Sequence, residues 1–205
     1  QLIRLPRTIG NHPETGDPTG LLLEMGRYLD SVIPVHPRDE LEDALTLFNQ
    51  RSLSLGITSL QDATAGNGIE QWRLFSDLSR LGRITPSLTL MPGIDNLSSF
   101  LDEGLGFGYQ SGNLRVGAAK LVINLTTGDM QPTPKRLLEL IKYANHVGFQ
   151  VAIHAVESES VRAAITAIQQ AGTEGISNTR RHRIEHCSEC PTDLMYEIVK
   201  SGISV

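Results

Sequence analysis

A repeated unit constrains the fold of this chain more than any other feature: a helical stretch ends in glycine, and a short apolar strand follows at once. The predicted helices cover residues 39–55, 71–81, 134–147 and 191–201, each directly before a glycine. Glycine is the usual residue just beyond a helix end, because it adopts a left-handed backbone without strain. The apolar runs that follow suit parallel strands covered by helices. This alternation predicts an α/β fold.

The residues that end successive strands are spaced by one unit of a parallel barrel. They are Asp62, Met91, Lys120, His154 and His186, at intervals of 29, 29, 34 and 32 residues. One strand–helix unit of a (β/α)₈ barrel takes roughly 30 residues. We therefore expect residues 39–205 to form a partial (β/α) TIM-type barrel, about strands 2–7 of eight. A doubly wound sheet has the same rhythm and stays an alternative, although no G-x-G-x-x-G opens a helix.

Residues 1–38 are expected to form a separate insertion. Prolines and glycines interrupt the first 20 residues, which predicts irregular coil, and a short helix is expected over residues 21–30.

Composition excludes several classes of protein. Hydrophobic residues make up 40% and charged residues 20%, which is not the balance of a disordered chain. A net charge of −5 argues against nucleic acid or an anionic membrane surface as a partner. No apolar run approaches the ~18 residues of a membrane span. Two cysteines and the lack of a secretory signal pattern favour the cytoplasm.

Two histidines stand at equivalent strand ends. His154 follows the apolar residues 151–153, and His186 follows residues 183–185 one unit later, so their strands should be neighbours. The carboxyl ends of barrel strands build active sites, and paired imidazoles are common metal ligands. The pattern predicts a divalent metal, zinc above all, at His154 and His186. In the alternative, both are structural residues of a non-catalytic barrel fragment.

Lys120 and Asp62 occupy two earlier strand ends. A lysine that closes a buried apolar strand is costly unless its charge is paired or removed. Reaction of its neutral amine with carbon dioxide would give a carbamate, an anionic metal ligand; otherwise Lys120 extends to the rim or pairs with Asp62. Asp62 is a candidate for substrate binding, for support of a metal ligand, or for capping the next helix.

Alternation along residues 183–185 predicts an ion pair between Arg183 and Glu185. Beyond them, Cys187 and Cys190 form a C-x-x-C at a strand-to-helix turn. A thiol oxidoreductase is therefore a further alternative, because a helix N-terminus lowers a thiol pKa. Small buried residues are the other explanation of the two cysteines.

Three motifs together resemble the amidohydrolase superfamily, and within it amidohydrolase family 3, which includes N-substituted formamide deformylase-like enzymes. They are Gly-Ile-Thr-Ser-Leu-Gln-Asp-Ala at 56–63, Val-Ala-Ile-His-Ala at 151–155 and Arg-His-Arg-Ile-Glu-His at 181–186. The resemblance implies a metal-dependent hydrolase that cleaves a C–N bond of a small molecule on a (β/α)₈ barrel. It matches His154 and His186 to the metal ligands of strands 5 and 6. It places Lys120 at the strand 4 lysine, which is often carboxylated.

Two parts of the family pattern are missing from the sequence. No His-x-His of strand 1 stands ahead of Gly56, and the chain stops at Val205, before the strand 8 Asp that would act as general base. We therefore expect a fragment that lacks its catalytic residue and is inactive alone. An open barrel would expose strand edges, so we expect self-association into a homo-oligomer.

Overall fold

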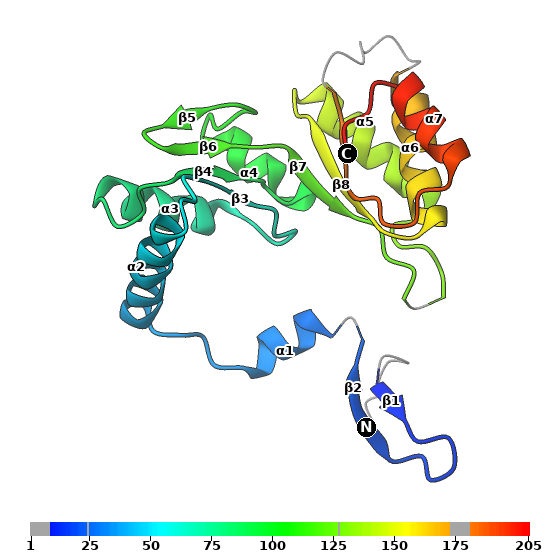
Figure 1. Cartoon of the computed structure of the whole chain (residues 1–205), viewed down its shortest axis with the longest axis horizontal. Helices are drawn as coiled ribbons and strands as arrows, with labels where there is room; N and C mark the ends of the chain where they lie inside the picture. Colours follow the sequence, from blue (N-terminus) through cyan, green and yellow to red (C-terminus); the bar gives the residue numbers. More distant parts are fainter. Residues whose placement is uncertain (1–8, 24, 127, 173–180) are drawn as a thin grey trace.

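Strands and helices alternate along most of the chain, as the glycine-terminated pattern predicts (Figure 1). The computed structural model describes residues 9–23, 25–126, 128–172 and 181–205. Its strands are β1 (Ile9–Asn11), β2 (Pro18–Leu22), β3 (Ser59–Asp62), β4 (Ser87–Leu90), β5 (Gln110–Ser111), β6 (Leu114–Val116), β7 (Ala119–Val122), β8 (Val151–Ala155) and β9 (Arg183–His186). Its helices are α1 (Gly26–Val32), α2 (Arg38–Ser54), α3 (Ile69–Arg80), the 3₁₀ turn η1 (Ile94–Asn96), α4 (Leu97–Asp102), α5 (Pro134–His146), α6 (Ser158–Gly172) and α7 (Thr192–Lys200).

The parallel strands follow one another in chain order through two sheets. The first sheet has the order β3-β4-β6-β5, in which only β5 is antiparallel to its neighbour. The second sheet has the order β7-β8-β9 and is wholly parallel. A parallel bridge between Gly93 and Lys120 joins the two sheets, and another from Arg183 to Ser204 continues beyond β9. The predicted α/β fold with parallel sheets is confirmed.

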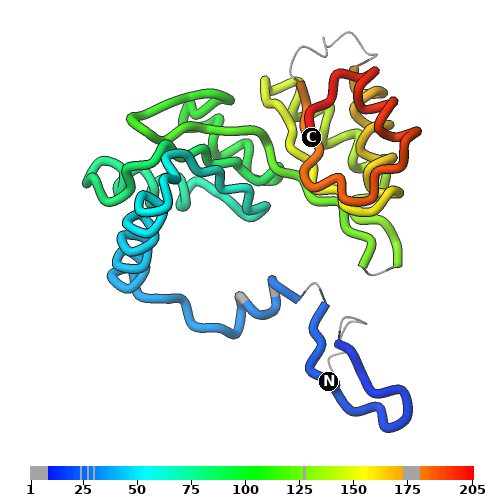
Figure 2. Tube along the Cα trace, in the orientation of Figure 1, coloured from blue at the N-terminus to red at the C-terminus, as the bar shows by residue number. Residues whose placement is uncertain are grey.

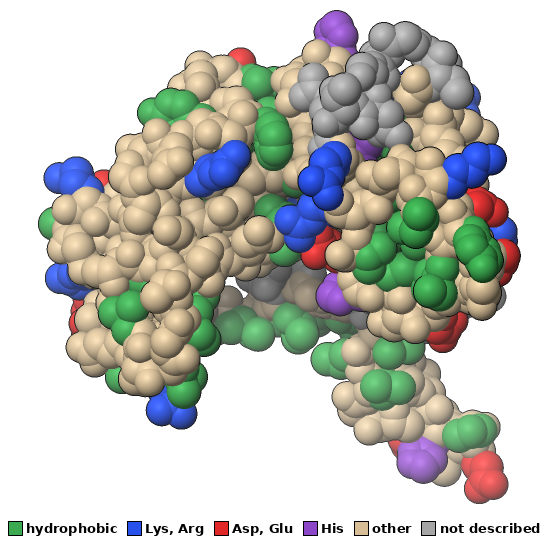
Figure 3. Space-filling view, turned by 45° about the horizontal axis from the view of Figure 1, so that its top comes forward, with side chains coloured by type: hydrophobic (Ala, Val, Ile, Leu, Met, Phe, Trp, Pro, Cys, Tyr) green, Lys and Arg blue, Asp and Glu red, His purple; other side chains and the backbone are tan. Residues whose placement is uncertain are grey.

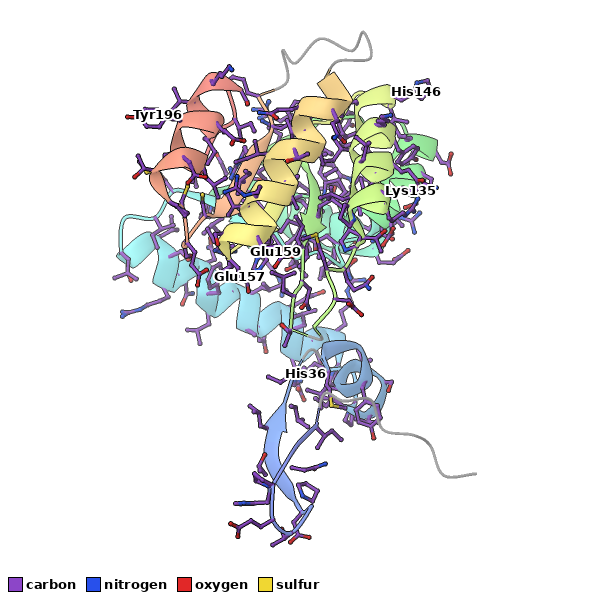
Figure 4. The ribbon with its side chains drawn as sticks, turned by 90° about the vertical axis from the view of Figure 1, so that its right-hand side faces the viewer. His36, Lys135, His146, Glu157, Glu159 and Tyr196 are labelled. Atoms are coloured by element: carbon purple, nitrogen blue, oxygen red, sulfur yellow. The ribbon has the colours of Figure 1, made fainter. Side chains whose placement is uncertain are left out.

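One hydrophobic core joins the helices to a single face of these strands. Leu90 and Val116 of the first sheet and Ile153 and Ile184 of the second belong to the same buried cluster as residues of α3 through α7. Figure 4 shows α5, α6 and α7 side by side over this face. Because side chains alternate along a strand, the residues between these point to the opposite face, here called the inner face. Its polar and charged members are Ser59, Gln61, Ser87, Thr89, Arg115, Lys120, His154, Arg183 and Glu185.

The glycines predicted to end helices do so. Gly56, Gly82, Gly148 and Gly202 follow α2, α3, α5 and α7 with φ angles of 73°, 69°, 92° and 64°. All four lie in the left-handed region, where a side chain is disfavoured. Glycine therefore follows these helices because the backbone there is left-handed, as predicted.

The N-terminal segment differs from the expected coil. Residues of β1 and β2 pair as an antiparallel hairpin, in which the Thr19 hydroxyl donates a hydrogen bond to the Gly10 carbonyl at 2.8 Å. The short helix begins at Gly26, so the helix expected over residues 21–30 is displaced along the chain. Figure 2 shows this segment lying apart from the α/β body, to which α2 connects it.

The strand expected just before Lys120 is divided in two. β6 pairs with β4, where Gly117 N donates to Leu90 O at 2.7 Å, and β7 then continues past the end of β4. A Cβ on Gly117 would lie only 2.7 Å from Thr89 Cγ2, so the close approach at this junction needs glycine. Lys120 is consequently the second residue of β7 and not a strand end.

Among the helices that the structure describes, none combines the length and the apolar character needed to span a membrane.

Candidate metal centre

The structure brings the two predicted histidine ligands together. β8 and β9 are adjacent and parallel, with His154 level with Glu185 and Ala155 level with His186. The imidazole ring centroids of His154 and His186 lie 4.5 Å apart, and the ring planes meet at 71°. Two imidazoles thus meet at the carboxyl edge of neighbouring strands, where the spacing of the sequence placed them.

The backbone at His186 produces this contact. In a regular strand, His186 would point away from the face of Glu185, and therefore away from His154. His186 instead has a φ of 73°, and Cys187 has a φ of 50°. This left-handed conformation costs a non-glycine residue roughly 1–2 kcal/mol. Such residues gather at functional sites. The turned backbone ends β9 and directs the imidazole of His186 against that of His154.

The histidine pair is accessible to solvent and has donor atoms that a metal ion can use. His186 is exposed and His154 is half-buried. An imidazole nitrogen in its neutral form is a preferred ligand of zinc and related ions. Within residues 9–23, 25–126, 128–172 and 181–205, no group of three or more His, Cys, Asp or Glu side chains could hold a metal ion. The two imidazoles have the donor chemistry that a metal prefers, but among the described residues they are not joined by a third such side chain.

Lys120 lies on the same face as His154 but two residues further from the strand end. In register it is level with Ala152 and Arg183, while Val122 is level with His154. The expectation that Lys120 ends its strand is therefore wrong, because β7 extends to Val122. Lys120 is only 4% exposed. Burial lowers the pKa of its amine, the Glu185 charge opposes this shift, and the Arg183 charge adds to it.

The predicted ion pair on β9 is confirmed, and its arginine also contacts β3. Arg183 Nη2 lies 2.7 Å from Glu185 Oε1. Both Nη atoms of Arg183 also donate to Gln61 Oε1 on β3, each at 3.4 Å. Arg183 therefore links the first and the last of the described parallel strands, across 122 residues of chain. No pattern in the sequence indicates this second contact.

Asp62 lies elsewhere. It lines a groove of about 440 Å³ that includes Phe48 of α2, Leu60 of β3 and Phe75 of α3, and none of the three predicted metal ligands. Its Oδ1 accepts a hydrogen bond from Thr64 N at 2.9 Å. It does not cap α3, because α3 begins at Ile69. Asp62 therefore stabilises the turn after β3 and is not brought to the histidine pair.

The C-x-x-C lies beside His186, with both thiols free and partly buried. Burial, followed by hydrogen bonding to Cys190, raises the pKa of the Cys187 thiol to about 11. A redox-active thiol needs a lowered pKa, because the thiolate is the reactive form. The shift is in the opposite direction and argues against a thiol oxidoreductase.

Comparison with known proteins identifies the family and the fold. A sequence model of the amidohydrolase family matches residues 10–202. Comparison with curated proteins gives no significant match. Two crystal structures of uncharacterized metal-dependent hydrolases, from Pyrococcus furiosus and Pyrococcus horikoshii OT3, have similar folds, each with a TM-score of 0.71 and 17% identity. The similarity covers 98% and 95% of this chain but 44% and 43% of theirs, so this chain spans less than half their length. Because the family model matches nearly all of its residues, the chain belongs to the amidohydrolase family.

Proposed function

We propose that the protein containing this chain is a metal-dependent hydrolase that cleaves a carbon–nitrogen bond, of the amide or formamide type, in a small molecule. The observation that most supports this proposal is the contact between the His154 and His186 rings, 4.5 Å apart. They lie at the carboxyl edge of adjacent parallel strands. Barrel enzymes hold their reactive groups at this edge. Within the family, we propose an N-substituted formamide deformylase-like activity.

His154 and His186 would hold the metal, for which we propose zinc. When bound, the metal would lower the pKa of a water molecule and polarise the carbonyl of the substrate. Lys120 is the proposed third ligand. Its burial favours the neutral amine, which is the form that reacts with carbon dioxide to give a carbamate. We assign no general base within this chain.

We also propose that the parallel strands are part of a (β/α) barrel. Helices α3 through α7 pack on one face of these strands in one core, whereas a doubly wound sheet has helices on both faces. The contact of Arg183 with Gln61 is the second support. With the divided strand β6–β7 counted once, β3 and β9 are the first and last of five strands. In a flat sheet they would lie roughly 19 Å apart. Their side chains could meet only if the sheet curls, as it does in a barrel.

The experiment that tests the metal centre measures zinc content. Wild-type protein and the variants His154→Ala and His186→Ala are loaded with zinc, dialysed and compared by elemental analysis and competition with a chelator. We expect at least a tenfold loss of zinc affinity in each variant. His146→Ala is the matched control, because His146 is an exposed histidine at the end of α5 (Figure 4).

A second candidate is a non-catalytic fragment in which the two histidines are structural. The two-ligand set among the described residues favours it. In that case zinc would be bound equally by wild type and both variants, or by none of them. Hydrolysis of N-formyl and N-acetyl amines by the full-length protein, with and without zinc, then tests the proposed reaction itself.

A further inference from the structure

A small cavity opens on the inner face, away from the histidine pair. It has a volume of about 180 Å³, and its polar lining residues are Gln61, Thr89, Arg115, Gln150 and Arg183. Two of these side chains are guanidinium groups, and none of the residues that line the cavity is an aspartate or a glutamate. Figure 3 shows Lys and Arg side chains near the middle of one face of the molecule, with an acidic and a His side chain close by.

This cavity is separate from the proposed metal centre. Gln150 precedes His154 by four residues, which is about 13 Å along a strand. Ala152, midway between them, is buried together with Met91 and Ala118, and Arg183 at the same level lines the cavity. Neither histidine of the pair lines the cavity.

Several hydrogen-bond donors at the cavity have no acceptor from the described protein residues, and Arg115 and Gln61 are exposed to solvent. Within the part of the chain that the structure describes, the Arg115 guanidinium makes no hydrogen bond or ion pair, and neither does the Thr89 hydroxyl. Gln61 uses its carbonyl oxygen to accept from Arg183. That orientation leaves the amide NH₂ of Gln61 as a further donor with no acceptor among the described residues. A cavity rich in donors and poor in acceptors fits a ligand that only accepts hydrogen bonds.

The charge around the cavity points to the same kind of ligand. Glu185 pairs with Arg183 at 2.7 Å, which leaves the charge of Arg115 uncompensated. The chain as a whole has a net charge of −5, so this face is positive against an acidic background. A local positive field in a concave site raises the concentration of anions there.

We propose that this cavity binds one small oxyanion, of the size and charge of phosphate or sulfate. Arg115 provides the main charge-assisted hydrogen bonds, and Gln61 and Arg183 complete the donor set. A volume of about 180 Å³ holds a single tetrahedral anion with a few waters and is too small for a nucleotide. The proposal concerns a second site and does not depend on the proposed reaction.

The test is a calorimetric titration with inorganic phosphate, repeated with sulfate, at constant ionic strength in chloride. Four proteins are compared: wild type, Arg115→Met, His154→Ala and Arg51→Met. Arg51 is an exposed arginine on α2 that lines none of the described cavities, so its loss controls for net charge. Circular dichroism checks that each variant is folded.

We expect saturable binding of one anion per chain in wild type, in His154→Ala and in Arg51→Met, and at least tenfold weaker binding in Arg115→Met. Absence of saturable binding in wild type would overturn the proposal, as would equal affinity in Arg115→Met and Arg51→Met. Loss of binding in His154→Ala would also overturn it, because the anion would then be bound at the metal centre. If a carboxylate of the same polypeptide filled the cavity, wild type would not bind phosphate and Arg115→Met would be less stable than wild type. That result would also overturn the proposal.

Discussion

His182 shows how one buried side chain joins two strands. It is 2% exposed, and its Nδ1 accepts a hydrogen bond from Val151 N at 3.2 Å. His182→Ala removes this acceptor at the start of β8. A buried donor left without a partner costs about 1–3 kcal/mol. We expect the free energy of unfolding to fall by that amount in urea denaturation.

The control for this prediction is His146→Ala, which removes an exposed imidazole at the end of α5. Surface substitutions of this kind change the free energy of unfolding by less than about 0.5 kcal/mol. Equal unfolding midpoints for the two variants would contradict the role of His182.

Only part of the candidate site could be predicted from the sequence. Histidines at equivalent strand ends can be recognised from spacing, and the structure places them in contact. Strict alternation would have put His186 on the other face, and the positive φ that redirects it leaves no mark in a sequence of ordinary residue types. Lys120 was misplaced by two residues for a related reason, because the end of β7 depends on its pairing with β8.

Among the elements, the turn after α3 gives the clearest test of the glycine pattern. Gly82 has a φ of 69°, and no neighbouring atom lies within 4 Å of the position that a Cβ would take. Only backbone strain therefore opposes a side chain there. Gly82→Ala should lower the free energy of unfolding by about 1–2 kcal/mol. Gly66→Ala is the matched control, since Gly66 is equally unobstructed and lies outside the left-handed region.

Chemical denaturation of both variants measures the difference. If Gly66→Ala were as destabilising as Gly82→Ala, left-handed strain would not explain why glycine ends the helices of this chain.

Helix ends set by the local residue could be predicted from the sequence. Strands whose bounds depend on pairing with another strand could not. The four helix ends follow from glycine, whose conformational freedom is a property of the residue itself. The β1–β2 hairpin was missed because its residues lack the alternation of a half-buried strand, and all five residues of β2 are exposed. The division between β6 and β7 was missed because it depends on the close approach of Gly117 to β4.

At the scale of the whole molecule, exposed apolar side chains favour self-association. Tyr196 and Val199 of α7 are 73% and 78% exposed, and Phe48 of α2 is 50% exposed. Tyr196 projects from the outer surface of α7 (Figure 4). We expect concentration-dependent association of the protein in sedimentation velocity, since apolar surface of this kind favours contacts between chains.

The double variant Tyr196→Lys, Val199→Lys should weaken that association, because it places charge on the face of α7. Tyr143→Lys is the control, since Tyr143 is a less exposed tyrosine on α5. A protein that stays monomeric at every concentration would contradict this prediction.

The proposed curling of the strands is the feature least accessible from sequence, because it depends on contacts between residues far apart in the chain. Arg183 and Gln61 provide a direct test, since they meet only if β3 and β9 are brought together. In a double-mutant cycle with Gln61→Ala and Arg183→Ala, we expect a coupling free energy of about 0.5–1.5 kcal/mol, the usual value of one hydrogen bond. The loss of the Glu185 pair is common to both arms and cancels.

The control cycle combines Gln61→Ala with Arg162→Ala, whose guanidinium pairs with Asp193 of α7 at 2.7 Å. These two sites share no partner, so their effects should add within about 0.3–0.5 kcal/mol. Additivity in both cycles would mean that Gln61 and Arg183 do not meet in solution and that the strands form an open sheet. Coupling confined to the first cycle would support a curled sheet, which is the arrangement that places the histidine edge and the arginine-lined cavity at different levels of one inner face.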